Sequence, residues 1–393
     1  MGRTRLLALF VASFGGTAAL AADWSALERY QQTVSRAEFE TLLTEVYCPS
    51  GALTNYLTFT TDSVSVFSTA EKKNPPLFAL RFSSAASSPV RRSPGESEFK
   101  RIALDPGHIG GAWARMEERF FEHGKDRPVQ EAELNLMVAR LLKTRLEAAG
   151  AQVFLTKENF EPVTDKRPED FQAQSEQEVK ASTRFDAFPP LEREAAFADA
   201  VRKRAELIFY RSSEIAARAK LLNEKIKPDL TICLHMNAVE WDECHNLVDD
   251  NRLVVFVHGN YLASELKDDD QKLRLFEKIL ERSHPTELAV AEALAAALAN
   301  ATKLPPVEYG PNSGSVHVDD NPYVFARNLA ANRLVNGPVV FLEPYYQNNR
   351  LVYQRIQLGD YEGLRNVNGT PMKSIFREYA DAVAEGLSKL IAR

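Results

Sequence analysis

Four polar residues have the side chains that a hydrolytic metal site needs: His108, Glu131, His235 and Glu343. Two imidazoles and one carboxylate can hold a zinc ion and leave its fourth position to water, as catalytic zinc sites do. Zinc lowers the pKa of its bound water to about 7, and a nearby carboxylate, here Glu343, could take the proton as this water attacks an amide carbonyl. The ligands are far apart in the chain and no HExxH motif is present, so spacing alone does not single out this site.

The elements expected around these residues would bring them together. Glu131 begins a predicted helix over 131–149, which Gly150 ends. In open α/β sheets, ligands bind beyond the carboxyl ends of the strands. The other three candidates follow apolar runs that are expected to be strands: 101–104 before His108, 230–234 before His235, and 339–342 before Glu343.

Strand-like and helical segments alternate through most of the chain, which predicts an α/β fold with a largely parallel or mixed open sheet flanked by helices. Thr370-Pro371 is expected to start a final helix that carries Ile375, Tyr379, Val383 and Leu387 on one face. The predicted strands are 101–104, 152–156, 230–234, 253–257 and 339–342.

The N-terminus has the three parts of a secretory signal peptide over residues 1–21, with cleavage expected before Ala22. Its apolar run from Leu6 to Phe14 is well short of the roughly 20 residues needed to cross a bilayer, so no stable membrane anchor is expected. These features predict a periplasmic or secreted protein. Cys48, Cys233 and Cys244 are an odd number in a compartment that permits disulfides, and their pairing stays open.

Residues 22–82 are predicted to form a small α+β module, with a helix that starts at the capping box Ser35 to Glu38 and two or three short strands. Residues 83–98 are rich in Ser, Pro and charge, as linkers are. The remaining residues, 99–393, form the predicted catalytic domain, with insertions near 157–217 and 259–285. The run Lys267 to Lys272 within the second insertion, which contains Asp268-Asp269-Asp270, is expected to be a solvated charged loop.

The candidate residues also lie in segments that resemble a known family, the zinc-dependent N-acetylmuramoyl-L-alanine amidases that hydrolyse bacterial cell walls. The four similar blocks occur in order along the chain, which is more specific than any single block. They are Ile102 to His108, Glu131 to Leu136, Arg218 with Asp229 to Ala238, and Gly337 to Glu343.

This resemblance implies Zn²⁺ on His108, Glu131 and His235, with Glu343 as general base. It implies peptidoglycan as the substrate and is compatible with a protein activator. The sequence departs from the family at Ile109, where a glycine is usual, and in the segment 344–346 after Glu343.

Composition limits the function classes further. The chain of 393 residues is 45% hydrophobic and 26% charged, which excludes disordered and low-complexity classes. Its net charge of −6 gives no basic surplus to neutralise a phosphate backbone, so no nucleic acid partner is expected.

Two other functions remain open from the sequence. They are a zinc deacylase or peptidase that acts on another exported amide, and a non-catalytic protein that binds the cell wall or activates another enzyme. The first insertion suggests restraint of the site, because one of its glutamates could take the open position on the zinc in place of water. These glutamates are Glu176, Glu178, Glu192, Glu194 and Glu206.

Overall fold

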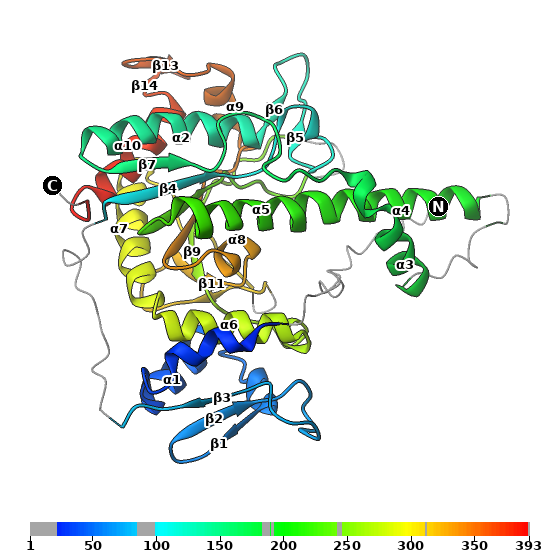
Figure 1. Cartoon of the computed structure of the whole chain (residues 1–393). Helices are drawn as coiled ribbons and strands as arrows, with labels where there is room; N and C mark the ends of the chain where they lie inside the picture. Colours follow the sequence, from blue (N-terminus) through cyan, green and yellow to red (C-terminus); the bar gives the residue numbers. More distant parts are fainter. Residues whose placement is uncertain are drawn as a thin grey trace.

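A seven-stranded mixed sheet forms the centre of the chain from residue 99 onward (Figure 1). The computed structural model describes residues 22–84, 99–182, 189, 192–241, 246–310 and 313–391. The predicted mixed open α/β sheet is confirmed. Its strands lie in the order β10 (Val316–His317), β11 (Val324–Arg327), β9 (Leu253–His258), β12 (Val339–Pro344), β8 (Leu230–Leu234), β4 (Arg101–Pro106) and β7 (Gln152–Leu155).

Strand direction decides where side chains can meet. β7, β4, β8 and β12 are parallel neighbours, so β4, β8 and β12 end at the same edge of the sheet. β9 runs antiparallel to β12, β11 is parallel to β9, and β10 is antiparallel to β11. The residues that follow β4 and β8 and those at the end of β12 are therefore brought together.

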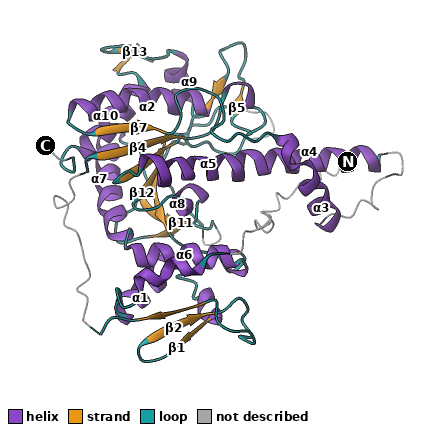
Figure 2. Cartoon of the chain, viewed as in Figure 1, coloured by secondary structure: helices purple, strands orange, loops and turns teal. Residues whose placement is uncertain are grey.

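Helices cover both faces of the sheet, as Figure 2 shows in purple on either side of the orange strands. One face packs against α2 (Glu131–Ala148), α7 (His284–Thr302) and α10 (Ile375–Leu387), and the other against α5 (Glu214–Lys220) and α8 (Ala330–Leu334). Alternate residues of β8 serve the two faces, with Ile232 in the first core and Cys233 in the second. Burial on both faces explains why these strands read as continuous apolar runs.

The predicted start of the last helix is wrong. Residues Thr370–Met372 form β14, which pairs with β13 (Arg365–Val367), and α10 begins only at Ile375. The turn between these strands is Asn368-Gly369, where both residues have positive φ, 51° and 85°. An Asn-Gly pair in this conformation is typical of a tight hairpin. This turn places Pro371 in strand β14 and not at the start of a helix.

The first insertion is helical and projects from the sheet (Figure 1). It contains α3 (Gln172–Ser182) and α4 (Arg193–Ile208), and α4 continues into α5 through a π-helical turn at Phe209–Ser213. Glu178 pairs with Arg204 and Glu206 with Arg202, so these two glutamates bind arginines of the insertion itself.

Residues 22–84 form a small unit of their own elements, which packs against the second insertion. α1 (Arg36–Leu42) begins at Ser35, whose hydroxyl accepts from the Glu38 amide, as the capping box predicted. The strands β1 (Leu57–Phe59), β2 (Ser63–Val66) and β3 (Phe78–Arg81) form an antiparallel sheet in that order. This unit shares one hydrophobic cluster with α6 (Asp269–Glu281).

Helix α6 occupies the segment that was expected to be a charged loop, so that prediction is wrong. Asp268 caps the helix through the amide of Asp270, and the Lys272 side chain is fully buried. Its ammonium donates to the carbonyl of Ser68 and to Asp269. Ser68 of the docked N-terminal unit and Asp269 of α6 itself therefore offset the cost of burying the ammonium.

Other sequence expectations concern cysteines and membranes. Cys48 and Cys233 are free and buried, whereas Cys244 lies outside the described residues, as does the predicted signal peptide. No helix in the described ranges is long and apolar enough to span a membrane.

Phe276 of α6 tests this packing, because its fully buried ring lies 5.8 Å from the ring of Trp24 and 5.3 Å from that of Phe39. We expect Phe276→Ala to lower the free energy of unfolding by about 3–5 kcal/mol, as loss of a buried phenyl group does. Leu351→Ala, at a side chain with 37% exposure, is the control and should change stability by less than about 0.5 kcal/mol. Equal denaturant midpoints for both variants would contradict the shared core.

Candidate metal centre and active site

Three side chains converge where the parallel strands end. Glu131 Oε1 lies 3.2 Å from His108 Nε2 and 3.0 Å from His235 Nδ1, and the three ligand atoms lie within 4.8 Å of one another. Ligand atoms around a tetrahedral zinc with bonds near 2.1 Å are about 3.4 Å apart. The donor set and its spacing therefore fit a zinc ion with three protein ligands.

Glu131 reaches the cluster from the first residue of α2, and it is 4% exposed. One turn later, the Asn135 side-chain amide lies 3.5 Å from Glu131 Oε1 and 3.5 Å from the Gly107 carbonyl. From the segment after β12, the Gln347 amide lies 3.4 Å from Glu131 Oε2. Burial raises the pKa of Glu131, but His108 and His235 bring it well below its ordinary value, so this carboxylate stays ionised.

Arg218 of α5 fixes the loop that carries His108. Its guanidinium donates to the carbonyls of Pro106 and His108, at 2.9 and 2.8 Å. It is 5% exposed, and its charge is balanced by Asp105 at 3.1 Å and Glu214 at 2.7 Å. A buried cation with two carboxylates and two carbonyls is well satisfied, which makes Arg218 a rigid support for the loop.

The sequence reasoning missed Glu117, which organises the same loop from within. Its carboxylate accepts from the amides of Ile109 and Gly110 at 3.0 Å and lies 3.7 Å from His108 Nδ1. A carboxylate on the second nitrogen of a ligating histidine fixes the orientation of the ring. Burial raises the pKa of Glu117, but His108 and the two amides lower it overall. No periodic pattern marks this residue, because the loop must fold back before the contact exists.

Ile109, the departure from the family pattern, is fully buried. Its carbonyl accepts from the Lys157 ammonium at 2.9 Å. The pKa of Lys157 is lowered to about 7, mainly by burial and in part by the neighbouring Arg218, whereas Asp105 acts in the opposite direction. Ile109 therefore contributes to the packing beneath the loop. The His108 side chain still reaches the cluster.

His235 is held between a ring and a glycine. Its imidazole stacks on Phe341 of β12, with ring centroids 4.2 Å apart and an interplanar angle of 19°. On the other side, a Cβ added at Gly107 would lie 2.1 Å from Cε1 of this imidazole. Only glycine permits this approach, which is a physical reason for a glycine directly before His108.

Glu343 lies at the end of β12, next to β8, which leads to His235. The Glu343 side chain is partly exposed, and no described residue forms a hydrogen bond with its carboxyl group. Its pKa is raised to about 7, mainly by burial and in part by the charge of Glu131, while Arg327 and Arg119 act in the opposite direction. The structure therefore places a carboxylate without a fixed partner in the electrostatic neighbourhood of the cluster.

The structure thus brings His108, Glu131 and His235 into one cluster and sets Glu343 close to it. Among the described residues, no glutamate of the first insertion belongs to this cluster. The fold and the cluster define an α/β protein with the groups that a metal-dependent hydrolase needs.

Comparison with protein-family models identifies the family of hydrolases to which the chain belongs. The model of the N-acetylmuramoyl-L-alanine amidase family matches residues 102–364, and the chain belongs to this family. The match includes all four candidate residues, so the resemblance and the enzymatic activity predicted from the sequence are confirmed. A comparison with curated proteins finds no match.

Solved structures give weaker similarities to the chain. The amidase Ami1 of Mycobacterium abscessus is 14% identical, with 73% of this chain and 95% of that chain covered and a TM-score of 0.37. AmiC2 of Nostoc punctiforme is 14% identical, with 73% and 93% covered and a TM-score of 0.36. The CwlD amidase of Clostridioides difficile, solved with the GerS lipoprotein, is 15% identical, with 74% and 98% covered and a TM-score of 0.39. The family assignment rests on the family model alone.

Gly107 tests the geometry of the cluster. We expect Gly107→Ala to displace the His235 imidazole and to lower the rate of peptidoglycan hydrolysis by about 10²-fold, the cost of a displacement near 1 Å in an active site. The matched control is Gly310→Ala, because a Cβ at Gly310 meets no atom within 4 Å. Release of soluble peptide from purified peptidoglycan measures both rates. A folded Gly107→Ala variant as fast as the control would contradict the close approach.

Proposed function

We propose that the chain is an exported zinc amidase that hydrolyses the amide bond between N-acetylmuramic acid and L-alanine. The observation that carries the zinc is the convergence of His108, Glu131 and His235, whose ligand atoms lie within 4.8 Å of one another. The donor chemistry fits as well, because two imidazoles and one carboxylate are typical of catalytic zinc. His108 Nε2, Glu131 Oε1 and His235 Nδ1 would hold the ion. When bound, zinc acidifies water and polarises a carbonyl group.

Glu343 is proposed as the general base. Its carboxylate would accept a proton from the attacking water while the water oxygen bonds to the amide carbon. It would then return the proton to the nitrogen of L-alanine as the carbon–nitrogen bond breaks. A carboxylate with a pKa near neutrality and no fixed partner suits both transfers, because proton transfer is efficient when the pKa lies near the working pH.

The chain organisation proposed from the sequence follows this role. Residues 1–21 would be removed as a signal peptide before Ala22, and the protein would act in the periplasm or outside the cell. Residues 22–82 would be an N-terminal module and 83–98 a linker, with 99–393 as the catalytic domain. Peptidoglycan is the proposed substrate, and a protein activator is compatible with this arrangement.

Metal content tests the ligand set. Purified protein should hold about one zinc ion per chain, and a chelator should abolish hydrolysis until zinc is restored. His108→Ala and His235→Ala should each lose most of the zinc, because a site with three protein ligands has none to spare. His317→Ala, at an exposed histidine, is the control and should keep it. Elemental analysis that finds full activity without metal would refute the site.

Glu343→Gln separates proton transfer from metal binding. The amide keeps the shape of the side chain but cannot accept the proton, so we expect retained zinc and a rate lower by about 10²–10⁴-fold. Glu362→Gln, whose side chain is 87% exposed, should leave the rate unchanged. Chromatography of the products should show stem peptides with N-terminal alanine and intact glycan strands. Loss of zinc in Glu343→Gln would make Glu343 a ligand, and new reducing ends would exclude the amidase reaction.

A further inference from the structure

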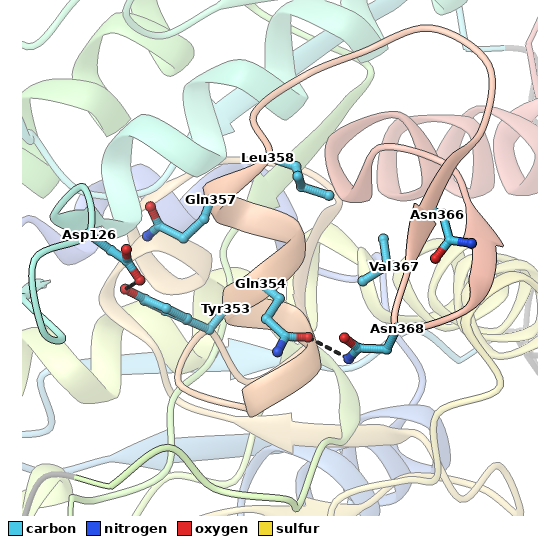
Figure 3. Close-up of a pocket in the computed structure, with 8 residues that line it drawn as sticks. All are labelled: Asp126, Tyr353, Gln354, Gln357, Leu358, Asn366, Val367 and Asn368. Atoms are coloured by element: carbon cyan, nitrogen blue, oxygen red, sulfur yellow. Dashed lines mark hydrogen bonds between the residues drawn. The ribbon is translucent and has the colours of Figure 1, made fainter.

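An open surface pocket with a volume of about 320 Å³ lies beside α9 (Arg350–Gln357), the β13–β14 hairpin and the loop that precedes β6 (Val129–Gln130). Figure 3 shows its lining residues, which come from these three segments. No step of the proposed mechanism uses them. They are Asp126, Tyr353, Gln354, Gln357, Leu358, Asn366, Val367 and Asn368.

We propose that this pocket binds an N-acetylated sugar of the glycan strand, away from the amide bond that is cut. The inference rests on the proposed function, since it assigns the pocket to the same peptidoglycan substrate. It adds a binding subsite, so its failure would leave the zinc site intact.

The lining is suited to sugar hydroxyls because half of it consists of amide side chains. A carboxamide offers donors and acceptors side by side, and a hydroxyl group needs both. Gln354 Oε1 accepts from Asn368 at 2.6 Å, and Asn366 Oδ1 accepts from the Gly369 amide at 2.8 Å. Within the described ranges, the NH₂ groups of Gln354 and Asn366 have no recorded protein partner. Two donors held in place by their own oxygens are thus available to a ligand.

The charge of the pocket lining favours a neutral ligand over an anionic one. None of the lining residues is basic, and Asp126 is the one carboxylic acid among them. The Tyr353 hydroxyl donates to Asp126 at 2.9 Å. Burial, together with this hydrogen bond, raises the pKa of Tyr353 to about 12, so the hydroxyl stays protonated. A phosphate or a free carboxylate would find no positive charge here, whereas a neutral sugar needs none.

The pocket also offers apolar surface. The Leu358 side chain is 38% exposed, and Val367 lies across the pocket from it, as Figure 3 shows. A sugar ring has an apolar face, and an N-acetyl group ends in a methyl group. Apolar walls with a few placed polar groups are the usual composition of ligand pockets.

The chain itself keeps the pocket near the metal centre. Asp126 is five residues before Glu131, so their Cα atoms are at most about 18 Å apart. The Tyr353 hydroxyl ties this loop to α9, and the Gln357 amide donates to the Arg127 carbonyl at 2.9 Å. A strand of a few sugars spans that distance. One strand could therefore fill the pocket while its muramoyl–alanine bond lies at Glu131.

The test removes the two free donors and keeps the internal hydrogen bonds. In Gln354→Glu with Asn366→Asp, the oxygens that accept from Asn368 and Gly369 remain, so the hairpin should stay folded. The added negative charge is matched by the control pair Gln32→Glu with Asn300→Asp, at exposed positions elsewhere. The probe is the β-1,4-linked tetramer of N-acetylglucosamine, which carries no peptide, titrated into full-length protein by calorimetry.

We expect saturable binding to the wild type and to the control pair, and binding weaker by at least about fivefold in the pocket variant, as loss of two hydrogen bonds predicts. On peptidoglycan, the pocket variant should raise KM and leave kcat within about twofold, because the contact lies away from the bond that is cut. On a single muramoyl peptide without neighbouring sugars, both parameters should stay unchanged.

The outcomes separate the two proposals. His108→Ala should bind the tetramer like the wild type, because the pocket needs no metal. Tetramer binding without amidase activity would therefore keep the pocket and refute the proposed function. Absence of saturable binding, or equal binding by the pocket variant, would overturn the pocket proposal. Weaker binding of a sugar-free stem peptide by the pocket variant would overturn it too, by assigning the pocket to the peptide.

Discussion

The carboxylate of Glu131 is shared by two imidazoles that arrive from different strands, and most of the structure around it serves this contact. A buried carboxylate is costly unless cations or hydrogen-bond donors surround it. α2 must start where β4 and β8 end, or the three groups cannot meet. Arg218 and Glu117 then hold the loop of His108, and Gly107 makes room for His235. The sheet supplies the common edge, and the loops supply the orientation.

The parts of the site that could be predicted are those that follow from periodicity. Continuous apolar runs such as 230–234 and 339–342 indicate buried strands, and parallel strands place the residues beyond their carboxyl ends together. His108, His235 and Glu343 were found in this way. The direction of β9 could not be found, because a buried apolar run has the same pattern in either direction. Its antiparallel pairing with β12 depends on the connection between them.

The remaining features depend on contacts between segments that are distant in sequence. Lys272 lies in a run of charges that favours a solvated loop, yet it is buried because residues 22–84 pack over α6. Glu117 resembles any surface glutamate until the loop closes on the amides of Ile109 and Gly110. The β13–β14 hairpin has a local signal in Asn368-Gly369, but Thr370-Pro371 predicts a helix start at the same place. Tertiary partners thus override the local preferences at Lys272 and Glu117, whereas the hairpin depends on its own turn.

The division between a buried charged centre and an exposed pocket without basic side chains has a physical basis in the substrate. Charges act most strongly where water is excluded, so the groups proposed for the chemistry are gathered at the end of the sheet. A glycan strand is long and neutral in its sugars, and it can be held by several modest contacts that are distributed along it. Binding energy from such remote contacts can orient the bond to be cut. A shallow pocket on a short hairpin is sufficient for that role, because the polymer supplies the length that the pocket lacks.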